Sequence, residues 1–388
     1  MEKNNIKFIA KTFSGLEEVL AKELKIIGAS DVAIQKRAVS FGGDEKLLYK
    51  SNLALRTCLR ILKPIHKFNA INPDQLYRNI QKYDWTKLIS VDDTFAIDSV
   101  VHSQYFKHSK YAALKAKDAI VDQIRYEKGK RPNIDIEDPT IRINLHIDHN
   151  VVTISLDSSG ESLHRRSYRL DGEKAPLNEV LAAGMILLSG WEGKSNIIDP
   201  MCGSGTLVIE AATLAKNIAP NLKRNNFGFM KWNTFNRKLY EEVKQELISN
   251  QKKSEIKIIG SDLSSSAIES ANKNAQRAEV SDIIDLRLND FEQLEHNLDN
   301  GIIITNPPYG ERLKQTNIND FYKKLGDTFK NNFNGFDAWV FSANKEALKN
   351  IGLRTSRRLL LSNGSLECKF HNYQLYKGSK KAKFKTDK

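Results

Sequence analysis

The sequence predicts an α/β protein in which a mostly parallel sheet follows two small α+β units. After about residue 194, apolar runs of four to six residues alternate with helical stretches, the pattern of a parallel sheet buried on both faces. A glycine turn, DPMCGSGT, follows the first of these runs, at the place where ligands bind to such sheets. Shorter strands and helices alternate ahead of it. A chain of 388 residues is long enough for two or three domains.

The first small unit covers about residues 7–67. Short strands are predicted at 7–10, 32–35 and 39–42 because these segments are apolar and are bounded by turn residues. Ser14 stands three positions before Glu17, the spacing of a capping box, and apolar residues then recur at the helical period. We therefore expect a helix that begins near Ser14.

The second small unit covers about residues 72–157. Its pattern predicts a strand near 95–101, a long helix near 109–126 and a pair of strands at 141–147 and 151–156. The segment that follows, DSSGES (157–162), has the composition of a linker.

The third unit should place its chemistry where its strands end. Ligands of parallel sheets bind at the carboxyl ends of the strands, beside the point where the strand order reverses. The polar residues at those ends are Asp199, Asp262, Asn289 with Asp290, and Asn306. Near the end of the chain, Asn363-Gly364 between two apolar stretches predicts an antiparallel hairpin. The lysine-rich tail after residue 377 predicts a disordered cationic arm.

The glycine turn favours an adenosine ligand that has no pyrophosphate. Gly203 and Gly205 stand where a backbone turns tightly and approaches a ligand. Val208 replaces the third glycine of a dinucleotide fingerprint, and Asp262 lies far beyond the ~20 residues at which that fingerprint expects an acid. A P-loop lysine is also missing after the glycines. At the end of the second strand, Asp262 is placed to accept hydrogen bonds from two ribose hydroxyls.

Composition narrows the classes of partner. Sixty Lys+Arg against 47 Asp+Glu give a net charge of +13 and a pI near 9.4, which favours a polyanion such as nucleic acid. Three dispersed cysteines form neither a disulfide framework nor a zinc pattern, so we expect no metal. The sequence shows no signal peptide and no stretch of membrane-spanning length. A cytoplasmic protein without a membrane partner is expected.

Residues from about 160 to 377 resemble the class I S-adenosylmethionine-dependent methyltransferases, of the kind that act on exocyclic amines. The resemblance rests on five motifs: DPMCGSGT (199–206) as motif I, GSDLS (260–264) as motif II, NDF (289–291) as motif III, NPPYG (306–310) as motif IV and APLNEVLAA (175–183) as motif X. It implies a Rossmann-like class I methyltransferase sheet. Motifs I and IV, in that order and at that spacing, are the most specific part of it.

The N-terminal part carries a second resemblance. KDAIVDQIRYEKGKRPNID (117–135) is similar to part of a THUMP domain, an RNA-binding module. As a whole the chain resembles the THUMP-domain-containing bacterial 23S ribosomal RNA (guanine-N2) methyltransferases of the RlmL N-terminal-half/YpsC type. The domains expected from this are a ferredoxin-like part at 1–67, a THUMP domain at 68–158, a methyltransferase domain at 159–377 and the basic tail at 378–388.

The resemblance implies a cofactor site for S-adenosyl-L-methionine, with S-adenosyl-L-homocysteine as product. The residues it assigns to the cofactor are Pro176, Leu177, Asp199, Pro200, Met201, Cys202, Gly203, Ser204, Gly205, Thr206, Asp262, Leu263, Asn289, Asp290, Phe291 and Asn306. Asp199 is expected to order the glycine loop and the amino-acid end of the cofactor. Asp290 and Phe291 are expected to flank the adenine, although Phe291 also fits a core position. Cys202 is expected to be a small buried loop residue.

Motif IV is the predicted catalytic element, formed by Asn306, Pro307, Pro308 and Tyr309. The exocyclic amine of a purine is a poor nucleophile because its lone pair is delocalised into the ring. If the Asn306 side chain and the Pro307 backbone carbonyl both accept hydrogen bonds from that amine, its lone pair turns towards the methyl group. Two prolines hold these acceptors in place, which is preorganisation rather than acid–base chemistry. Tyr309 would stack on the extruded base.

Basic residues interleaved with aromatic ones favour RNA, because phosphates need cations and unstacked bases need rings. Tyr105, Phe106, Tyr111 and Tyr126 are the rings near the predicted long helix. The basic residues expected to bind RNA are Lys107, Lys110, Lys117, Arg125, Lys130, Arg131, Arg165 and Arg166.

The predicted function is methylation of a guanine N2 amine in large-subunit ribosomal RNA, with 23S ribosomal RNA as the partner. Three alternatives stay open at this point: methylation of adenine N6 in DNA or RNA, methylation of a protein glutamine, and an RNA-binding assembly factor without catalysis. The oligomeric state is also open, with a monomer favoured.

Overall fold

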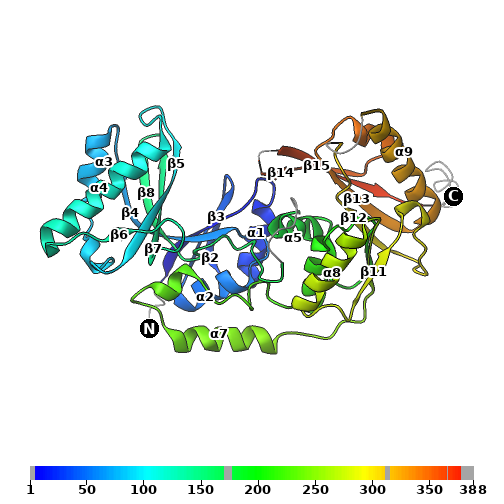
Figure 1. The fold of residues 1–388 in the computed structure, drawn as a ribbon, viewed down its shortest axis with the longest axis horizontal. Helices are drawn as coiled ribbons and strands as arrows, with labels where there is room; N and C mark the ends of the chain where they lie inside the picture. The colour runs from blue at the N-terminus through cyan, green and yellow to red at the C-terminus, as the bar shows by residue number, and fades with distance from the viewer. Residues whose placement is uncertain (1–4, 170–176, 311–314, 365, 377–388) are drawn as a thin grey trace. The chain divides into compact units, whose positions relative to one another are not determined.

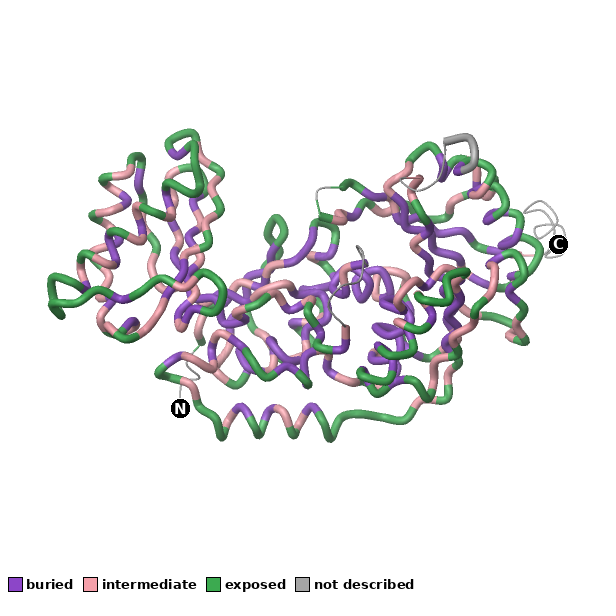
Figure 2. The backbone as a smooth tube through the Cα atoms, in the orientation of Figure 1, coloured by how far each residue is buried: buried purple, intermediate pink, exposed green. Residues whose placement is uncertain are grey.

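The computed structural model describes residues 5–169, 177–310, 315–364 and 366–376. It divides into two compact units (Figure 1). The first unit comprises 1–12, 21–163 and 224–245, and the second comprises 13–20, 164–223 and 246–388. Each unit has its own sheet and buried core (Figure 2). The described part of the chain contains no helix long and apolar enough to cross a bilayer.

One eight-stranded sheet, in the order β2-β3-β1-β4-β8-β7-β5-β6, forms the first unit. The two small units predicted from the sequence are therefore joined in one sheet, where β4 pairs antiparallel with β8. The strands are β1 (Ile6–Lys11), β2 (Ser30–Gln35), β3 (Ala38–Gly43), β4 (Arg60–Asn69), β5 (Thr94–His102), β6 (Asn133–Ile134), β7 (Ile141–Asp148) and β8 (Val151–Asp157). The helices are α2 (Glu45–Ala54), α3 (Pro73–Ile80), η1 (Trp85–Lys87) and α4 (Ser109–Lys128).

The predicted start of the first helix is wrong. Helix α1 (Glu17–Ile26) begins three residues later than Ser14. Gly15 adopts φ +90° and interrupts the predicted cap, and the Glu17 carboxylate accepts a 2.7 Å hydrogen bond from the Gly15 N–H. The expected strands near 95–101, 141–147 and 151–156 and the long helix near 109–126 are confirmed within one or two residues.

The second unit contains a seven-stranded sheet in the order β11-β10-β9-β12-β13-β15-β14. Its first five strands run parallel, and β15 returns antiparallel beside β13 and β14. The predicted α/β fold with a terminal antiparallel hairpin is confirmed. The strands are β9 (Ile197–Asp199), β10 (Ile258–Asp262), β11 (Ile284–Leu288), β12 (Gly301–Thr305), β13 (Phe336–Ser342), β14 (Arg357–Asn363) and β15 (Leu366–Gln374). The helices are α5 (Glu179–Leu188), α6 (Thr206–Ala215), α8 (Ser265–Arg277), η3 (Phe291–Gln293), α9 (Gln315–Asn332) and η4 (Ala347–Ile351).

A segment from the middle of the methyltransferase-like half belongs to the first unit. Residues 224–245, which contain η2 (Gly228–Lys231) and most of α7 (Arg237–Ser249), pack against β4, α2 and the THUMP-like part. The ring of Phe229 lies 4.7 Å from that of Tyr49, and Tyr240 lies 6.0 Å from the same tyrosine. We call residues 224–245 the insertion.

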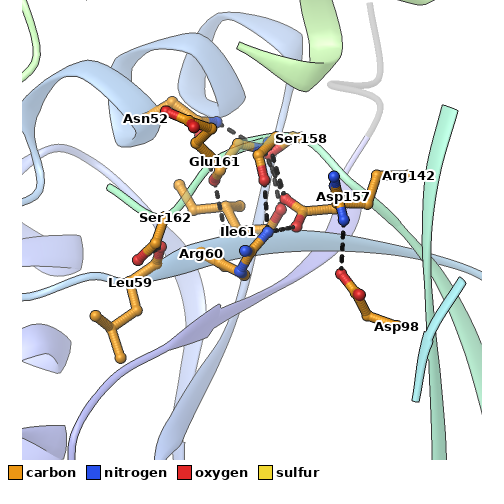
Figure 3. A network of polar contacts seen from close by, with 12 residues as sticks. Asn52, Leu59, Arg60, Ile61, Asp98, Arg142, Asp157, Ser158, Glu161 and Ser162 are labelled. Carbon is orange, nitrogen blue, oxygen red and sulfur yellow. Dashed lines mark hydrogen bonds and ion pairs between the residues drawn. The ribbon is translucent and has the colours of Figure 1, made fainter. Parts of the chain in front are cut away.

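The first three residues of the DSSGES segment are buried in a polar network, so the segment is not a linker (Figure 3). The side chains of Asp157, Ser158 and Ser159 are almost completely buried. Arg60 forms an ion pair with Asp157, and Asn52 donates a 3.0 Å hydrogen bond to the Ser158 hydroxyl. Burial raises the pKa of Asp157, while the Arg60 guanidinium opposes that rise. The polar side chains that suggested a linker instead form hydrogen bonds with buried groups inside the unit.

The Arg224 side chain connects the insertion to this segment, and so does a 2.9 Å hydrogen bond from the Phe229 N–H to the Ser158 carbonyl. The Arg224 guanidinium donates hydrogen bonds of 2.9 Å to the backbone carbonyls of Ser159 and Glu161 and of 3.1 Å to that of Ser162. Because the guanidinium is buried, these carbonyls replace its water shell.

Candidate active site

The strand order reverses at β9, which lies between β10 and β12. Asp199 ends β9 and is paired in register with Gly260 of β10, while Asp262 ends β10. Asn306 directly follows β12. The three polar residues predicted from the strand ends therefore lie at one edge of one sheet, at its topological switch point.

The glycine loop is held by the carboxylate of Asp262. Its Oδ2 accepts a 2.9 Å hydrogen bond from the Gly203 N–H, and its Oδ1 accepts one of 3.0 Å from the Ser264 N–H. Gly203 has φ +53°, and a Cβ added there would meet no atom within 4 Å. The absence of a side chain at Gly203 thus leaves open space beside the loop, and a ligand can approach the backbone there.

Gly205 is a glycine for a different reason. It caps α6 with φ +85°, and a Cβ there would lie 3.0 Å from the Cβ of Ala271 on α8. The Asn274 amide of α8 also donates a 3.1 Å hydrogen bond to the Ser204 carbonyl. Helix α8 therefore fixes the loop from one side, because its small residue allows a close approach and its amide anchors the backbone.

Asp199 is a buried carboxyl beneath the loop. It accepts a 3.2 Å hydrogen bond from the Met201 N–H and is 2% exposed. Burial raises the pKa of Asp199 to about 7, and the neighbouring Asp262 carboxylate adds to that rise. The group can therefore change its charge near neutral pH.

Cys202 is a buried thiol, as predicted. Its side chain faces Gly260 and is 7% exposed. Burial, together with the carboxylates of Asp199 and Asp262, raises the pKa of Cys202 well above its usual value. A thiol that stays protonated is a poor nucleophile.

The residues after β11 divide between surface and core. Asp290 caps η3 by accepting a 3.0 Å hydrogen bond from the Glu292 N–H, and Asn289 is half-buried. The Phe291 ring packs in the core, edge to face with Phe321 at 5.2 Å. Of the two positions expected for this ring, the core position is observed, and its place beside the adenine stays a prediction. Leu263, 68% exposed, offers an apolar side chain beside Asp262.

The backbone of the NPPY segment accepts hydrogen bonds from one side chain of α9 and from one that follows β13. The Asn344 amide donates a 2.9 Å hydrogen bond to the Tyr309 carbonyl, and the Tyr322 hydroxyl donates one of 3.3 Å to the Pro308 carbonyl. The hydroxyls of Tyr322 and Ser342 are hydrogen-bonded to each other at 2.7 Å. The backbone of the segment is therefore preorganised, as the two prolines predicted.

The Tyr309 side chain turns inwards. Its hydroxyl donates a 2.5 Å hydrogen bond to Asn306 Oδ1, and its ring lies 6.4 Å from that of Phe341, edge to face. Burial raises the pKa of Tyr309 above its usual range, and Cys368 contributes to that rise. In this structure the acceptor predicted for a target amine is thus occupied by the chain's own hydroxyl.

Arg166 was predicted to contact RNA, and this prediction is wrong. Its side chain is 1% exposed and lies 3.5 Å from the equally buried Glu210 on α6. The Tyr168 hydroxyl donates a 3.2 Å hydrogen bond to the same carboxylate. A guanidinium that is buried in an ion pair cannot reach a phosphate, whereas Arg165 is exposed.

Arg169, which sequence reasoning missed, connects two of the predicted motifs. Its guanidinium forms a 3.2 Å ion pair with Glu179 at the start of α5. It also donates hydrogen bonds of 3.3 Å to the Leu177 carbonyl and 2.5 Å to the Thr206 hydroxyl. The segment before α5 and the end of the glycine loop are therefore held together by one side chain. Pro176 lies outside the described residues.

The other basic residues predicted to bind RNA lie on or near α4. Lys107, Lys110, Arg125, Lys130 and Arg131 are exposed, and Lys117 is half-buried and paired with Asp118 at 2.9 Å. Tyr105, Tyr111 and Tyr126 are exposed rings, but Phe106 is 5% exposed and belongs to the core.

Comparison with known proteins identifies the second unit. Residues 166–372 match the model of the RMKL-like methyltransferase domain. The chain belongs to this family. Residues 70–157 match the THUMP domain and residues 7–62 match the RlmL ferredoxin-like domain. The predicted S-adenosylmethionine-dependent methyltransferase, with a ferredoxin-like part and a THUMP domain before it, is confirmed.

Similar full-length proteins agree with this family. A Synechocystis protein, slr0064, provisionally named an RNA methyltransferase, is 39% identical over 95% of this chain and 97% of its own. The ribosomal RNA large subunit methyltransferase K/L of Syntrophotalea carbinolica is 38% identical over 95% of this chain, but this chain spans only 54% of that protein. SMU.472, a provisionally assigned methyltransferase solved with S-adenosylhomocysteine, is 27% identical, covers 98% of this chain and 100% of its own, and has a TM-score of 0.86.

Proposed function

We propose that this methyltransferase transfers a methyl group from S-adenosylmethionine to the N2 amine of a guanine in 23S ribosomal RNA. The observation that carries the proposal is a preorganised NPPY segment beside the glycine loop, in a chain that also matches the THUMP domain. The relative named for methylation of the large ribosomal subunit supports the choice of RNA. That substrate implies the cytoplasm as the compartment.

The residues present fit the cofactor. Gly203 leaves open space where a side chain would otherwise stand, so we assign the loop from Asp199 to Thr206 to the amino-acid end of the cofactor. Asp262, whose oxygens each accept only one hydrogen bond among those described, has acceptor capacity for two ribose hydroxyls. Leu177, Leu263, Asn289 and Asp290 complete the assigned site, with Phe291 assigned through its backbone. The cofactor supplies an electrophilic methyl group on a sulfonium.

The catalytic assignment is Asn306 with the Pro307 carbonyl. Two acceptors held by rigid backbone can orient an amine without a strong base, because the proton can leave after transfer. Guanine N2 and adenine N6 are both exocyclic amines, so adenine N6 is the second candidate that this geometry accepts. An enzyme acting on DNA would have no evident use for a THUMP domain, and the intact loop and NPPY segment argue against a non-catalytic assembly factor.

Nucleoside mass spectrometry of ribosomal RNA tests the proposal. A deletion strain should lose one N2-methylguanosine from 23S ribosomal RNA, and the wild-type gene should restore it while a gene encoding Asn306→Ala should not. Loss of an N6-methyladenosine would replace the proposal with its rival. An unchanged modification profile would leave it without support.

Asp199 predicts a pH dependence of cofactor binding. The pKa of this carboxyl is raised from 3.8 to about 7, so between those values the free protein holds a proton that a cationic ligand group displaces. Affinity for S-adenosylhomocysteine should therefore rise with pH up to about 7 and then level off. Calorimetric titration in buffers of different ionisation heat should detect proton release near pH 6. Asp199→Asn should abolish that release; a pH-independent release in both proteins would contradict the assignment.

The proposed RNA contacts predict a salt dependence. Replacing Lys110, Arg125 and Lys130 together by Gln should reduce the magnitude of the slope of log affinity against log salt by about 2 to 3, since each lost phosphate contact removes about 0.7–0.9. Fluorescence anisotropy with a ribosomal RNA fragment measures this. The control is the double variant Lys22→Gln with Lys25→Gln, two exposed lysines on α1, which should leave the slope unchanged. Equal slopes in the triple variant and the wild type would remove α4 from the RNA surface.

A further inference from the structure

The insertion forms one wall of a hollow in the first unit. This hollow has a volume of about 330 Å³, and the described residues that line it come from four parts of the chain. Strand β4 contributes Lys63 and Ile65, the segment after α3 contributes Tyr83, Lys87 and Leu88, β8 contributes Leu156, and the insertion contributes Trp232, Asn233 and Thr234. Residues far apart in the sequence thus converge on one concave surface.

The insertion is fastened at this place by polar contacts on both sides of Trp232. The Asn233 amide donates a 3.3 Å hydrogen bond to the Lys87 carbonyl. The Lys231 ammonium pairs with the Asp138 carboxylate at 2.5 Å and donates to the Pro139 carbonyl at 3.2 Å. The wall is therefore fixed to the THUMP part of the unit, as a binding surface requires.

The lining has the chemistry of a nucleotide site. The described residues that line it include two lysines, no acid, and an apolar and aromatic set made up of Ile65, Tyr83, Leu88, Leu156 and Trp232. The Lys63 ammonium lies 5.8 Å from the centroid of the Trp232 ring. Rings and aliphatic side chains accept an unstacked base, and ammonium groups accept a phosphate.

A further feature fits an incoming phosphate. The Lys87 ammonium pairs with Asp84 at 3.1 Å, but both side chains are largely exposed. Such surface pairs contribute little, so a phosphate can compete for this lysine.

We propose that this hollow binds one unstacked nucleotide of the RNA substrate, with its base against the apolar and aromatic lining residues and its phosphate at Lys63 and Lys87. The size agrees, because about 330 Å³ lies at the small end of the ~300–1,000 Å³ range of ligand sites. The proposal rests on RNA as the substrate. It also gives the insertion a role. Although the insertion lies within the sequence of the methyltransferase domain, it contributes residues to the RNA site.

Filling the hollow tests the proposal in the full chain. Thr234 is exposed at its edge, so Thr234→Trp should occupy the space without disturbing the core, and Thr234→Val is the matched control of nearly equal volume. Anisotropy titration with an RNA fragment should show the affinity of the Trp variant reduced about tenfold, as loss of one stacked base implies. The Val variant should bind like the wild type.

The phosphate half of the site has its own variant. Lys63→Met with Lys87→Met keeps the aliphatic part of each side chain. It should reduce the magnitude of the slope of log affinity against log salt by about 1.4, as loss of two single-strand phosphate contacts predicts. The control Lys22→Met with Lys25→Met removes the same charge from α1 and should leave the slope unchanged.

Photocrosslinking locates the nucleotide directly. RNA that carries 4-thiouridine should crosslink to peptides containing Tyr83 or Trp232, and Thr234→Trp should abolish these crosslinks. Crosslinks confined to other peptides, together with wild-type affinity of the Trp variant, would overturn the proposal. The methylation assay separates that result from a failure of the proposed function, because RNA would then still be bound and methylated.

Discussion

Asp262→Ala is expected to weaken S-adenosylhomocysteine binding by a factor on the order of 10² to 10⁴. Two ribose hydroxyls would lose a charged acceptor, and each such bond contributes about 1.5–3 kcal/mol, with about 1.4 kcal/mol for each factor of ten in affinity. The same carboxylate holds Gly203 and Ser264, so part of the loss would come from a looser loop. Isothermal titration calorimetry gives the affinity, and the thermal midpoint shows whether the variant is folded.

A ligand without one hydroxyl separates the two contributions. The wild type should bind 2′-deoxy-S-adenosylhomocysteine more weakly than the parent ligand, whereas Asp262→Ala should bind both equally, because the partner of that hydroxyl is already gone. If the variant still discriminated between the ligands as the wild type does, Asp262 would only fasten the loop and would not contact the ribose.

The sheet and the loop of the second unit could be predicted because local sequence determines them. Gly203 and Gly205 have positive φ, and the antiparallel hairpin predicted at Asn363-Gly364 is observed, with Asn363 as the last residue of β14 and paired with Leu366. Parallel strands then bring Asp199, Asp262 and Asn306 to one edge. Each of these inferences needs only short-range turn chemistry and the rule that ligands bind at carboxyl ends.

The insertion could not be predicted in this way, because its fold depends on contacts across long sequence separations. Tyr49 meets Phe229, which lies 180 positions later, and no period in either segment indicates the pairing. A cluster of aromatic residues at 227–235 between motifs I and II was the available signal. It shows that this stretch needed a hydrophobic partner but not which one.

Net charge indicated the kind of partner but not whether each basic residue is exposed or buried. Arg165 and Arg166 are adjacent and identical in type, yet one is exposed and the other is buried against Glu210. Burial depends on the face that the chain turns to α6, which the composition of the segment does not record. In the same way, the serines of 157–162 suggested solvent but satisfy buried groups.

The Tyr309 hydroxyl competes with a target amine for the Asn306 side-chain oxygen. Its hydrogen bond to Asn306 Oδ1 occupies the acceptor proposed for the target amine. Tyr309→Phe should therefore keep the ring and release the acceptor, and methyl transfer should stay within a few-fold of the wild type. A loss as large as that of an Asn306 variant would instead assign the hydroxyl itself to the reaction.

Asn306→Ala should reduce the rate of methyl transfer by about 10² or more, as removal of one preorganised polar group does, while affinity for S-adenosylhomocysteine changes little. Asn306→Asp is the sharper variant. A carboxylate also accepts a hydrogen bond from the amine, so partial activity should survive; if the Asn306 amide instead donates to the base, Asp should be as inactive as Ala. Single-turnover methylation of RNA, with cofactor affinity measured alongside, distinguishes these outcomes. Equal rates in all three proteins would show that the segment is only a turn, because neither its acceptor nor its charge would then affect the reacting amine.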